Sequence, residues 1–266
     1  MQLDIIIPAH NEQHRIGRTL DDYRHTCNLA DTAFDTRFVV ALDDCTDATA
    51  QLVAEHGEEG RVVSRYFPRL GKGGVLAEAF RDSHADYVAF VDADGATPPE
   101  ELLRLVQACE HLDTDIAIAS RYHPASVLPV ARRRSRQVTA RCFAAVVRQM
   151  FKLPYFDTQC GAKVLRRSAV ERITPLLSAR DFVFDVDLLT TARALGFRVA
   201  EVPTVWLDRD GSRLATNRDS LRMLASLAVL WLRQRVVPVQ LPAADVVELP
   251  AGEVTPQPQP GGTRVA

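Results

Sequence analysis

The sequence predicts an α/β protein in which helices cover both faces of a mostly parallel sheet. Two observations carry this prediction. Runs rich in β-branched and aromatic residues alternate with segments of helical periodicity over residues 3–119, and the connections between them are short. The composition, 47% hydrophobic and 25% charged, is typical of a soluble protein with a proper core. The net charge of −2 argues against general binding to nucleic acids.

The first half of the chain predicts five strands with helices between them. Pro8 is expected to end the first strand, and Asp47 or Thr46 to cap the second helix. Pro98 and Pro99 mark the start of a helix that carries an apolar stripe. The five strands are expected at residues 3–8, 38–42, 61–64, 87–91 and 115–119. This alternation up to residue 121 is typical of a nucleotide-binding half.

The second half is less regular. Helical patterns are expected at residues 132–151, 168–177, 182–195 and 217–237, and a strand at 197–206. Pro203 predicts that this strand lies at an edge of the sheet. The stretch 157–163 is polar, and no strand is expected there. Pro, Gly, Gln and acidic residues from Pro242 onward indicate a disordered tail.

The expected compartment is the reducing cytoplasm. The five cysteines form no C-x-x-C pair and are odd in number. The first strand begins within two residues of the start, which leaves no room for a signal peptide. No uncharged run approaches the roughly 20 residues that span a bilayer. We therefore expect no membrane crossing.

The strand at 87–91 runs directly into Asp92-Ala93-Asp94-Gly95. Ligands of parallel α/β sheets gather at the carboxyl ends of the strands. Two carboxylates spaced i, i+2 offer hard oxygen ligands for Mg²⁺ or Mn²⁺, and such an ion is commonly shared with substrate phosphates. The alternative is an ordinary turn in which an aspartate caps the next helix.

Other polar loops are expected at the same edge. Residues 8–12 (P-A-H-N-E) follow the first strand, and Asp43 and Asp44 follow the second. Gly71-Lys72-Gly73-Gly74 is expected to place backbone N–H groups and a lysine near phosphates at a helix N-terminus. Neither the P-loop pattern G-x-x-x-x-G-K-[ST] nor G-x-G-x-x-G after the first strand is present. Together these loops favour a nucleotide site of another kind.

The ordered motifs resemble those of the family-2 inverting glycosyltransferases. In the first half they are P-A-H-N-E, D-D-C-T-D, G-K-G-G, D-A-D-G and the pair Ser120-Arg121. Residues 157–163 (D-T-Q-C-G-A-K), 184–189 (F-D-V-D-L-L) and 201–213 (E-V-P-T-V-W to G-S-R) are similar to the dolichyl- or polyprenyl-phosphate glucosyltransferases. A more distant similarity is to the polyprenyl-phosphate mannose synthases. The resemblance covers roughly residues 3–214 and implies the A-type glycosyltransferase fold.

The resemblance also implies a division of the chain and a set of site residues. One domain would span residues 1–240, with a nucleotide-binding half at 1–121, an acceptor half at 122–240 and a disordered tail at 241–266. The nucleotide-sugar would contact Pro8, Ala9, Glu12, Asp44, Lys72, Asp92, Ala93 and Asp94, and Asp92 and Asp94 would hold Mg²⁺ or Mn²⁺. Arg121 and Arg213 would face the acceptor phosphate, and Asp185, Arg121 and Lys163 would be catalytic. The position of the arginine cluster at 132–136, between Arg121 and an apolar helix, adds Arg133 and Arg134 to the residues expected at the acceptor phosphate; the alternative is a solvated basic face.

Three departures from the family pattern stand out. The second motif, usually D-D-G-S-T-D, is one residue shorter here, at Asp44-Cys45-Thr46-Asp47. Arg213 replaces the usual lysine. Many relatives also carry C-terminal membrane spans, which this sequence lacks, and that absence favours a soluble acceptor.

The expected reaction moves a sugar, with glucose from UDP-glucose as the leading choice, onto a polyprenyl phosphate. A phosphate acceptor needs cations and no strong base, since it is already largely anionic at pH 7. A small hydroxyl acceptor would instead need Asp185 as a base. A third alternative is mannose transfer from GDP-mannose to a polyprenyl phosphate.

The final helix at 217–237 has a broad apolar side with arginines around it. Three alternatives follow for that side: a membrane surface, the body of the protein, or a second copy in a homodimer. With the first, the protein would lie peripherally on the inner face of the membrane.

Overall fold

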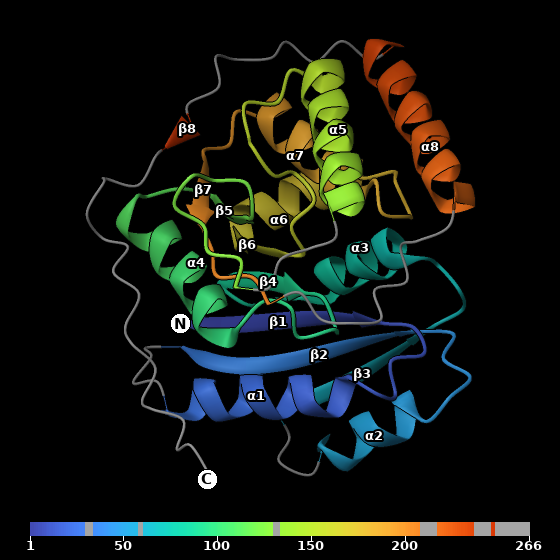
Figure 1. The fold of residues 1–266 in the computed structure, drawn as a ribbon. Helices are drawn as coiled ribbons and strands as arrows, with labels where there is room; N and C mark the ends of the chain where they lie inside the picture. Colours follow the sequence, from blue (N-terminus) through green and yellow to red (C-terminus); the bar gives the residue numbers. More distant parts are fainter. Residues whose placement is uncertain (30–33, 58–60, 130–133, 208–216, 237–245, 248–266) are drawn as a thin grey trace, which may run out of the picture.

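The computed structural model describes residues 1–29, 34–57, 61–129, 134–207, 217–236 and 246–247. Its centre is one sheet with the strand order β3-β2-β1-β4-β6-β5-β7-β8 (Figure 1). The strands are β1 Gln2–Ala9, β2 Asp35–Asp43, β3 Val62–Phe67, β4 Tyr87–Val91, β5 Ile116–Ser120, β6 Ala162–Arg166, β7 Val199–Pro203 and β8 Val246–Val247. All neighbouring pairs among them are parallel except those that β6 makes with β4 and β5. The predicted α/β class with a mostly parallel sheet is confirmed.

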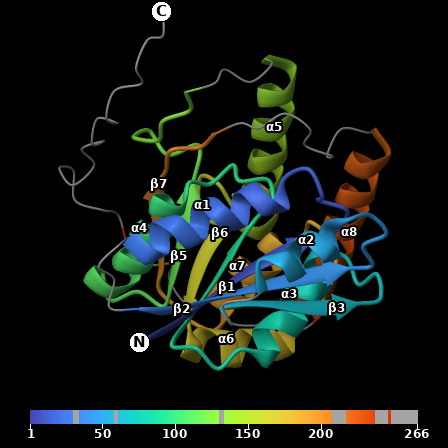
Figure 2. The same ribbon diagram turned by 90° about the horizontal axis from the view of Figure 1, so that it is seen from below.

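Helices cover both faces of this sheet, as Figures 1 and 2 show. They are α1 Ile16–Leu29, α2 Thr49–Glu55, α3 Lys72–Asp82, α4 Pro99–His111, α5 Arg134–Phe151, α6 Arg167–Ile173, α7 Phe184–Ala194 and α8 Asn217–Val236, with a 3-10 turn at Thr174–Leu176. The pleat of β1 divides the core. Leu3, Ile5 and Ile7 pack with α1, α2 and α4, while Ile6 packs with α3, α6 and α7 on the other face.

β6 is the main departure from the expected sheet. The polar stretch 157–163 was expected to hold no strand, but Ala162 starts a strand that pairs antiparallel with both β4 and β5. Lys163 and Arg166 interrupt the apolar pattern of A-K-V-L-R, so the sequence does not show the strand's alternation. Pairing satisfies the backbone groups of two strands that would otherwise present open edges. It also sets Lys163 beside Phe90, two residues before Asp92.

Two expectations that were based on proline, the end of the first strand at Pro8 and the edge position of the strand with Pro203, need correction. β1 continues through Pro8 to Ala9, with Pro8 in register with Ala41 of β2. Pro203 ends β7, and the prediction that β7 is an edge strand is wrong, because β8 follows β7 in the strand order. β8 lies beside β7, but it pairs only with Val199 and Ala200, so it does not reach Pro203.

The sheet takes strands from both predicted halves of the chain, since β6 and β7 follow residue 121. The division at 121 and the disordered tail remain predictions; β8 is the part of the tail that the structure describes. Among the helices of the described ranges, none is long and apolar enough to cross a membrane.

Candidate active site

The polar loops meet at one edge of the sheet. β1, β2 and β4 are parallel, so their carboxyl ends lie at the same edge. β6 runs antiparallel to β4, with Ala162 beside Val91, so the start of β6 lies there as well. This topology brings the loop before β6 against the Asp92 loop.

Three hydrogen bonds hold the Asp92–Gly95 loop, two of them to other parts of the chain. The Asp92 N–H donates to the Gly161 carbonyl (3.1 Å), and the Ala93 carbonyl accepts from the Thr19 hydroxyl of α1 (2.9 Å). Asp94 Oδ1 accepts from the Ala96 N–H at 3.0 Å. The loop is therefore fixed by contacts to α1 and to the start of β6.

Gly161 is essential to this arrangement for a steric reason. A Cβ on Gly161 would lie 1.9 Å from Asp92 Oδ2, far inside van der Waals contact. The absence of a side chain at this position therefore leaves room for the Asp92 carboxylate.

Two lysines and two carboxylates form a chain of ionic contacts below the loop. Lys72 Nζ lies 2.7 Å from Asp92 Oδ1 and 3.8 Å from Asp185 Oδ2. Lys163 is fully buried, and its Nζ donates to Asp185 Oδ1 (2.5 Å) and to the Cys160 carbonyl (2.7 Å). Burial lowers the pKa of Lys72, but the Asp92 and Asp185 carboxylates outweigh it and leave that pKa above its usual value. Lys72 is therefore held as a cation beside Asp92 and Asp185, and Lys163 lies against the same Asp185 carboxylate.

The residues at this edge suit a divalent ion. Burial and the Asp92 carboxylate raise the pKa of Asp94, because two nearby negative charges repel each other. A cation would relieve that repulsion. Within the described residues no group of three potential ligands is present. Two carboxylates fit Mg²⁺ or Mn²⁺, which takes its remaining ligands from phosphates and water.

The glycine-rich stretch at 71–74 does not cradle phosphate as predicted. The N–H groups of Gly73 and Gly74 donate to the Arg180 carbonyl, at 2.9 and 3.2 Å. A Cβ on Gly73 would lie 2.5 Å from the Ala179 carbonyl oxygen. The glycines thus allow close packing of α3 against residues 178–181, and only Lys72 of this stretch extends to the Asp92 carboxylate.

Two buried carboxylates support this packing. Asp43 accepts from the N–H groups of Leu70 (2.6 Å) and Gly71 (2.9 Å). On the other side, Asp187 accepts from the N–H groups of Ser178 and Ala179. The start of α3, and with it Lys72, is fixed between them.

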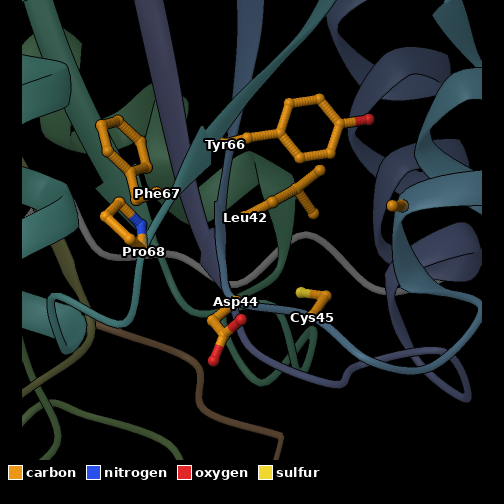
Figure 3. A pocket seen from close by; sticks show the side chains of 7 residues that line it. Leu42, Asp44, Cys45, Tyr66, Phe67 and Pro68 are labelled. Atoms are coloured by element: carbon orange, nitrogen blue, oxygen red, sulfur yellow. The ribbon is translucent and has the colours of Figure 1, made fainter.

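Asp44 lines a pocket of about 420 Å³ (Figure 3). Its other lining residues are Leu42, Cys45, Ala50, Tyr66, Phe67 and Pro68. Asp44 has a φ of 52°, and its N–H donates to the Phe67 carbonyl (2.9 Å). The pocket combines one exposed carboxylate with apolar and aromatic walls, which suits a planar, hydrogen-bonding ring.

Pro8, Ala9 and Glu12 lie at the end of β1 and in the turn after it. The Ala9 carbonyl accepts from the Cys45 thiol (3.3 Å), and Glu12 accepts from Arg15 Nε at 2.7 Å. The charge of Arg15 acts on Asp94, whose pKa it lowers against the stronger effect of burial. The end of β1 therefore lies between the Asp44 pocket and the Asp94 loop.

Arg121, which was predicted to face the acceptor phosphate, is paired with Asp157. Arg121 Nε and Nη2 donate to the two carboxylate oxygens at 2.7 and 3.0 Å, and the guanidinium stacks on Trp206 at 5.0 Å. Burial raises the pKa of Asp157, but Arg121 outweighs it and holds that pKa below its usual value. Glu201, whose own pKa is raised by burial, accepts from the N–H groups of Phe156 and Asp157, both at 2.9 Å.

The remaining predicted arginines are not placed beside this pair. Arg133 and Arg213 lie outside the described residues, and Arg134 is described only as the first residue of α5. Three residues that fix the site, Asp157, Gly161 and Glu201, were missed, and Asp43 was expected at this edge but was given no role. All four stand in motifs quoted above or directly beside one, so motif membership was the available signal.

A mostly parallel sheet with Asp92 and Asp94 at the carboxyl ends of its strands, and a pocket beside Asp44 at the same edge, define an α/β protein of the class that binds its ligand at this edge. The profile of glycosyl transferase family 2 matches residues 4–174. The chain belongs to glycosyl transferase family 2.

Curated relatives agree with this assignment. The chain is 31% identical over 242 residues to a dolichyl-phosphate beta-glucosyltransferase of Dictyostelium discoideum, with 87% of this chain and 74% of the relative covered. It is 28% identical to the enzyme of that name from Saccharomyces cerevisiae, with 86% and 73% covered. Glycosyltransferase AglD of Haloferax volcanii is 30% identical over 240 residues. That match covers 90% of this chain and 38% of AglD, so the chain spans well under half of that relative.

Solved structures identify the fold. Glucosyl-3-phosphoglycerate synthase from Mycobacterium tuberculosis, crystallised with UDP, superposes with a TM-score of 0.62 at 19% identity over 86% of this chain and 80% of that one. A complex of the same enzyme with Mn²⁺, UDP and glucosyl-3-phosphoglycerate gives a TM-score of 0.62 over 91% and 81%. The predicted A-type glycosyltransferase fold is confirmed.

Proposed function

We propose that this chain transfers glucose from UDP-glucose to a polyprenyl or dolichyl phosphate, with inversion at C1. The observation that carries the acceptor assignment is the environment of Asp185. Its side chain is 2% exposed, Lys163 lies against one carboxylate oxygen, and Lys72 lies 3.8 Å from the other. A general base must reach the proton that it removes. A phosphate acceptor carries no such proton at neutral pH.

The names of the relatives support the choice of glucose and of a lipid phosphate. Several, from Dictyostelium to yeast, are called dolichyl-phosphate beta-glucosyltransferase. The complexes of the structural neighbours with UDP support UDP as the nucleotide of the donor. We extend glucose, UDP and the lipid phosphate from these proteins to this chain.

On the donor side, Asp44 would hydrogen-bond the uracil ring in the pocket, with Pro8, Ala9 and Glu12 around the nucleoside. Asp92 and Asp94 would hold Mg²⁺ or Mn²⁺ on the diphosphate, with Ala93 between them against the sugar nucleotide. The ion, when bound, supplies Lewis-acid stabilisation of the leaving diphosphate. Lys72, held as a cation 2.7 Å from Asp92, adds positive charge at the same place.

On the acceptor side, Arg121 would bind the phosphate through the part of its guanidinium that Asp157 leaves open. Lys163 would contribute its positive charge to the site and fix Asp185, and Arg133, Arg134 and Arg213 would add cations near the entering phosphate. The acceptor oxygen forms the new bond to C1 as the bond from C1 to the UDP oxygen breaks. Positioning and charge stabilisation, without proton removal, carry this reaction.

A transfer assay separates this proposal from its alternatives. Purified protein with Mn²⁺ and UDP-[¹⁴C]glucose would be offered a polyprenyl phosphate, the matching polyprenol, or a small soluble phosphorylated hydroxyl compound. Label should enter the organic phase only with the polyprenyl phosphate. Transfer to the polyprenol or to the soluble compound instead would refute the acceptor, and GDP-[¹⁴C]mannose replacing UDP-glucose would refute the donor.

A further inference from the structure

Helices α5 and α8 lie side by side on one side of the molecule (Figures 1 and 2). Among the residues that the structure describes, α8 packs on the body of the protein through one face. On that face Leu227 and Leu230 are buried, the Ser226 hydroxyl donates to Asp181, and the Gln234 amide donates to the Thr190 hydroxyl at 2.6 Å. The body of the protein is therefore the partner of this face and not of the opposite one.

The opposite face of α8 is apolar and exposed. Val229 is 67% exposed, Leu232 57% and Leu224 45%. Together with the exposed Ala225 and Ala228 they follow the i, i+3, i+4, i+7 spacing of one helical stripe. α5 adds Val146, 41% exposed. We call this surface, with its flanking arginines, the α5–α8 face.

Positive charge accompanies these apolar residues. The sequence of α5 contains four arginines and no acidic residue, and that of α8 contains four arginines and one aspartate. The two helices thus carry net charges of +4 and +3 in a chain whose net charge is −2. Arg222 and Arg233 are exposed, and the helical spacing places both along one flank of the apolar stripe.

We propose that the α5–α8 face docks on the surface of a membrane that contains anionic lipids. An apolar stripe beside exposed arginines is the pattern of a helix that lies in the membrane interface. A second copy of this chain is a poor occupant, because it would bring two strongly positive faces together. An anionic bilayer complements both the charge and the apolar stripe.

Docking there also suits the acceptor, a point that rests on the proposed function. Arg148 of α5 lies over the ring of Phe156, 5.3 Å from its centroid. Phe156 is 40% exposed and precedes Asp157, which holds Arg121. A lipid phosphate in the docked membrane would thus enter beside the arginine that is proposed to bind it.

Vesicle binding of the full-length protein tests the proposal. Co-sedimentation would compare phosphatidylcholine vesicles with vesicles that also contain phosphatidylglycerol. The wild type should bind the anionic vesicles at least about tenfold more strongly. The double variant Val229→Asp/Leu232→Asp should lose at least about tenfold in partitioning, because it puts charge into the apolar stripe. Arg222→Glu/Arg233→Glu should lose roughly 25-fold on the anionic vesicles alone.

Matched controls are Leu176→Asp, at an equally exposed apolar position (50%) of the 3-10 turn, and Arg18→Glu on the exposed side of α1. Both should bind as the wild type does. Equal binding by all variants, or no preference for anionic vesicles, would overturn the proposal. So would a dimer, seen by light scattering, that the Val229 and Leu232 changes dissociate.

An assay with a short-chain, water-soluble polyprenyl phosphate distinguishes failure of the surface from failure of the proposed function. All the variants should use this acceptor as well as the wild type, and fall behind only when a long-chain acceptor is embedded in vesicles. Vesicle binding without transfer to either acceptor would leave the α5–α8 face standing and refute the proposed function.

Discussion

The proposed donor side and the proposed acceptor side of this site hold their charges in different ways. On the donor side, Asp92 and Asp94 follow a strand, and their short loop is positioned mainly by hydrogen bonds to its backbone from α1 and from the residue before β6. The Asp92 side chain remains 33% exposed, open to a ligand. On the acceptor side, Arg121 and Lys163 are held by Asp157 and Asp185, carboxylates that are 1% and 2% exposed.

The difference shows what each side can tolerate. Half-buried carboxylates at a loop can wait for a cation, since water reaches them and, for Asp92, the Lys72 ammonium lies 2.7 Å away in its absence. Buried ion pairs cannot lose one member without leaving an uncompensated charge in the interior. We therefore expect changes on the acceptor side to unfold the protein, and changes on the donor side to abolish binding while the fold persists.

The largest effect is expected for Asp157→Ala. It leaves Arg121 unpaired inside the protein, which should lower the free energy of unfolding by about 3–5 kcal/mol in urea denaturation. The control is Asp22→Ala in α1, which removes an exposed carboxylate near Arg18 (3.7 Å) and should cost less than about 1 kcal/mol. Equal costs for the two variants would mean that the acceptor side is no more dependent on its ion pairs than the surface is.

The second-largest effect is expected for Gly161→Ala, a change just before β6 that acts on the donor carboxylate Asp92. Gly161→Ala adds a methyl group at 1.9 Å from Asp92 Oδ2, so it should displace the carboxylate without adding or removing charge. Misplacing a reacting group by about 1 Å can cost roughly 100-fold in kcat/KM. Thermal stabilisation by Mn²⁺ with UDP should disappear as well.

Gly17→Ala in α1 is the matched control, because its Cβ would meet only His56, at 3.7 Å. Alanine in a helix is favoured over glycine by about 1 kcal/mol, so this variant should keep full activity and melt slightly higher. Unchanged Mn²⁺ binding in Gly161→Ala would show that β6 does not set the donor carboxylate.

A smaller effect is expected at the nucleotide pocket. Asp44→Ala should weaken the binding of UDP and of UDP-glucose alike by roughly 1.5–3 kcal/mol, because the contact is to the base. Calorimetry with both ligands measures this, with Asp82→Ala, exposed on α3, as the control. A loss confined to UDP-glucose would move Asp44 from the base to the sugar.

The smallest effect is confined to acid. Because Arg121 lowers the folded-state pKa of Asp157, the stability from this pair is present above the ordinary aspartate value of 3.8 and is lost as pH falls below it. The difference in unfolding free energy between wild type and Asp157→Asn should therefore shrink between pH 6 and pH 3. A difference that grows in acid would contradict the sign of the shift.

The sequence allowed the donor side to be predicted in more detail than the acceptor side, for a physical reason. Asp92 and Asp94 follow a strand directly, so a local pattern places them. Gly71, Gly73 and Gly74 were misread because their function is close packing against Arg180, more than 100 residues away in the chain. Local pattern cannot distinguish a glycine that approaches backbone from one that approaches phosphate.

On the acceptor side nearly every contact is long-range. Asp157 meets Arg121 across 36 residues, Glu201 meets Asp157 across 44, and Lys163 meets Asp185 across 22. β6 was missed because a buried lysine breaks its apolar pattern. The motifs identified the region, but only the antiparallel insertion of β6 shows that Lys163 and Gly161 serve the same site as Asp92.

The central claim is that Asp185 positions two lysines and removes no proton. Its most direct test is the pH profile of kcat/KM for a polyprenyl phosphate, measured for the wild type and for Asp185→Asn. The asparagine can still accept from Lys163, and a thermal melt verifies the fold. Both profiles should rise with the second ionisation of the acceptor phosphate near pH 6, and they should differ by less than about tenfold. A loss of 10²–10⁴-fold in a folded Asp185→Asn, with the rise in the profile gone, would show that Asp185 is the base.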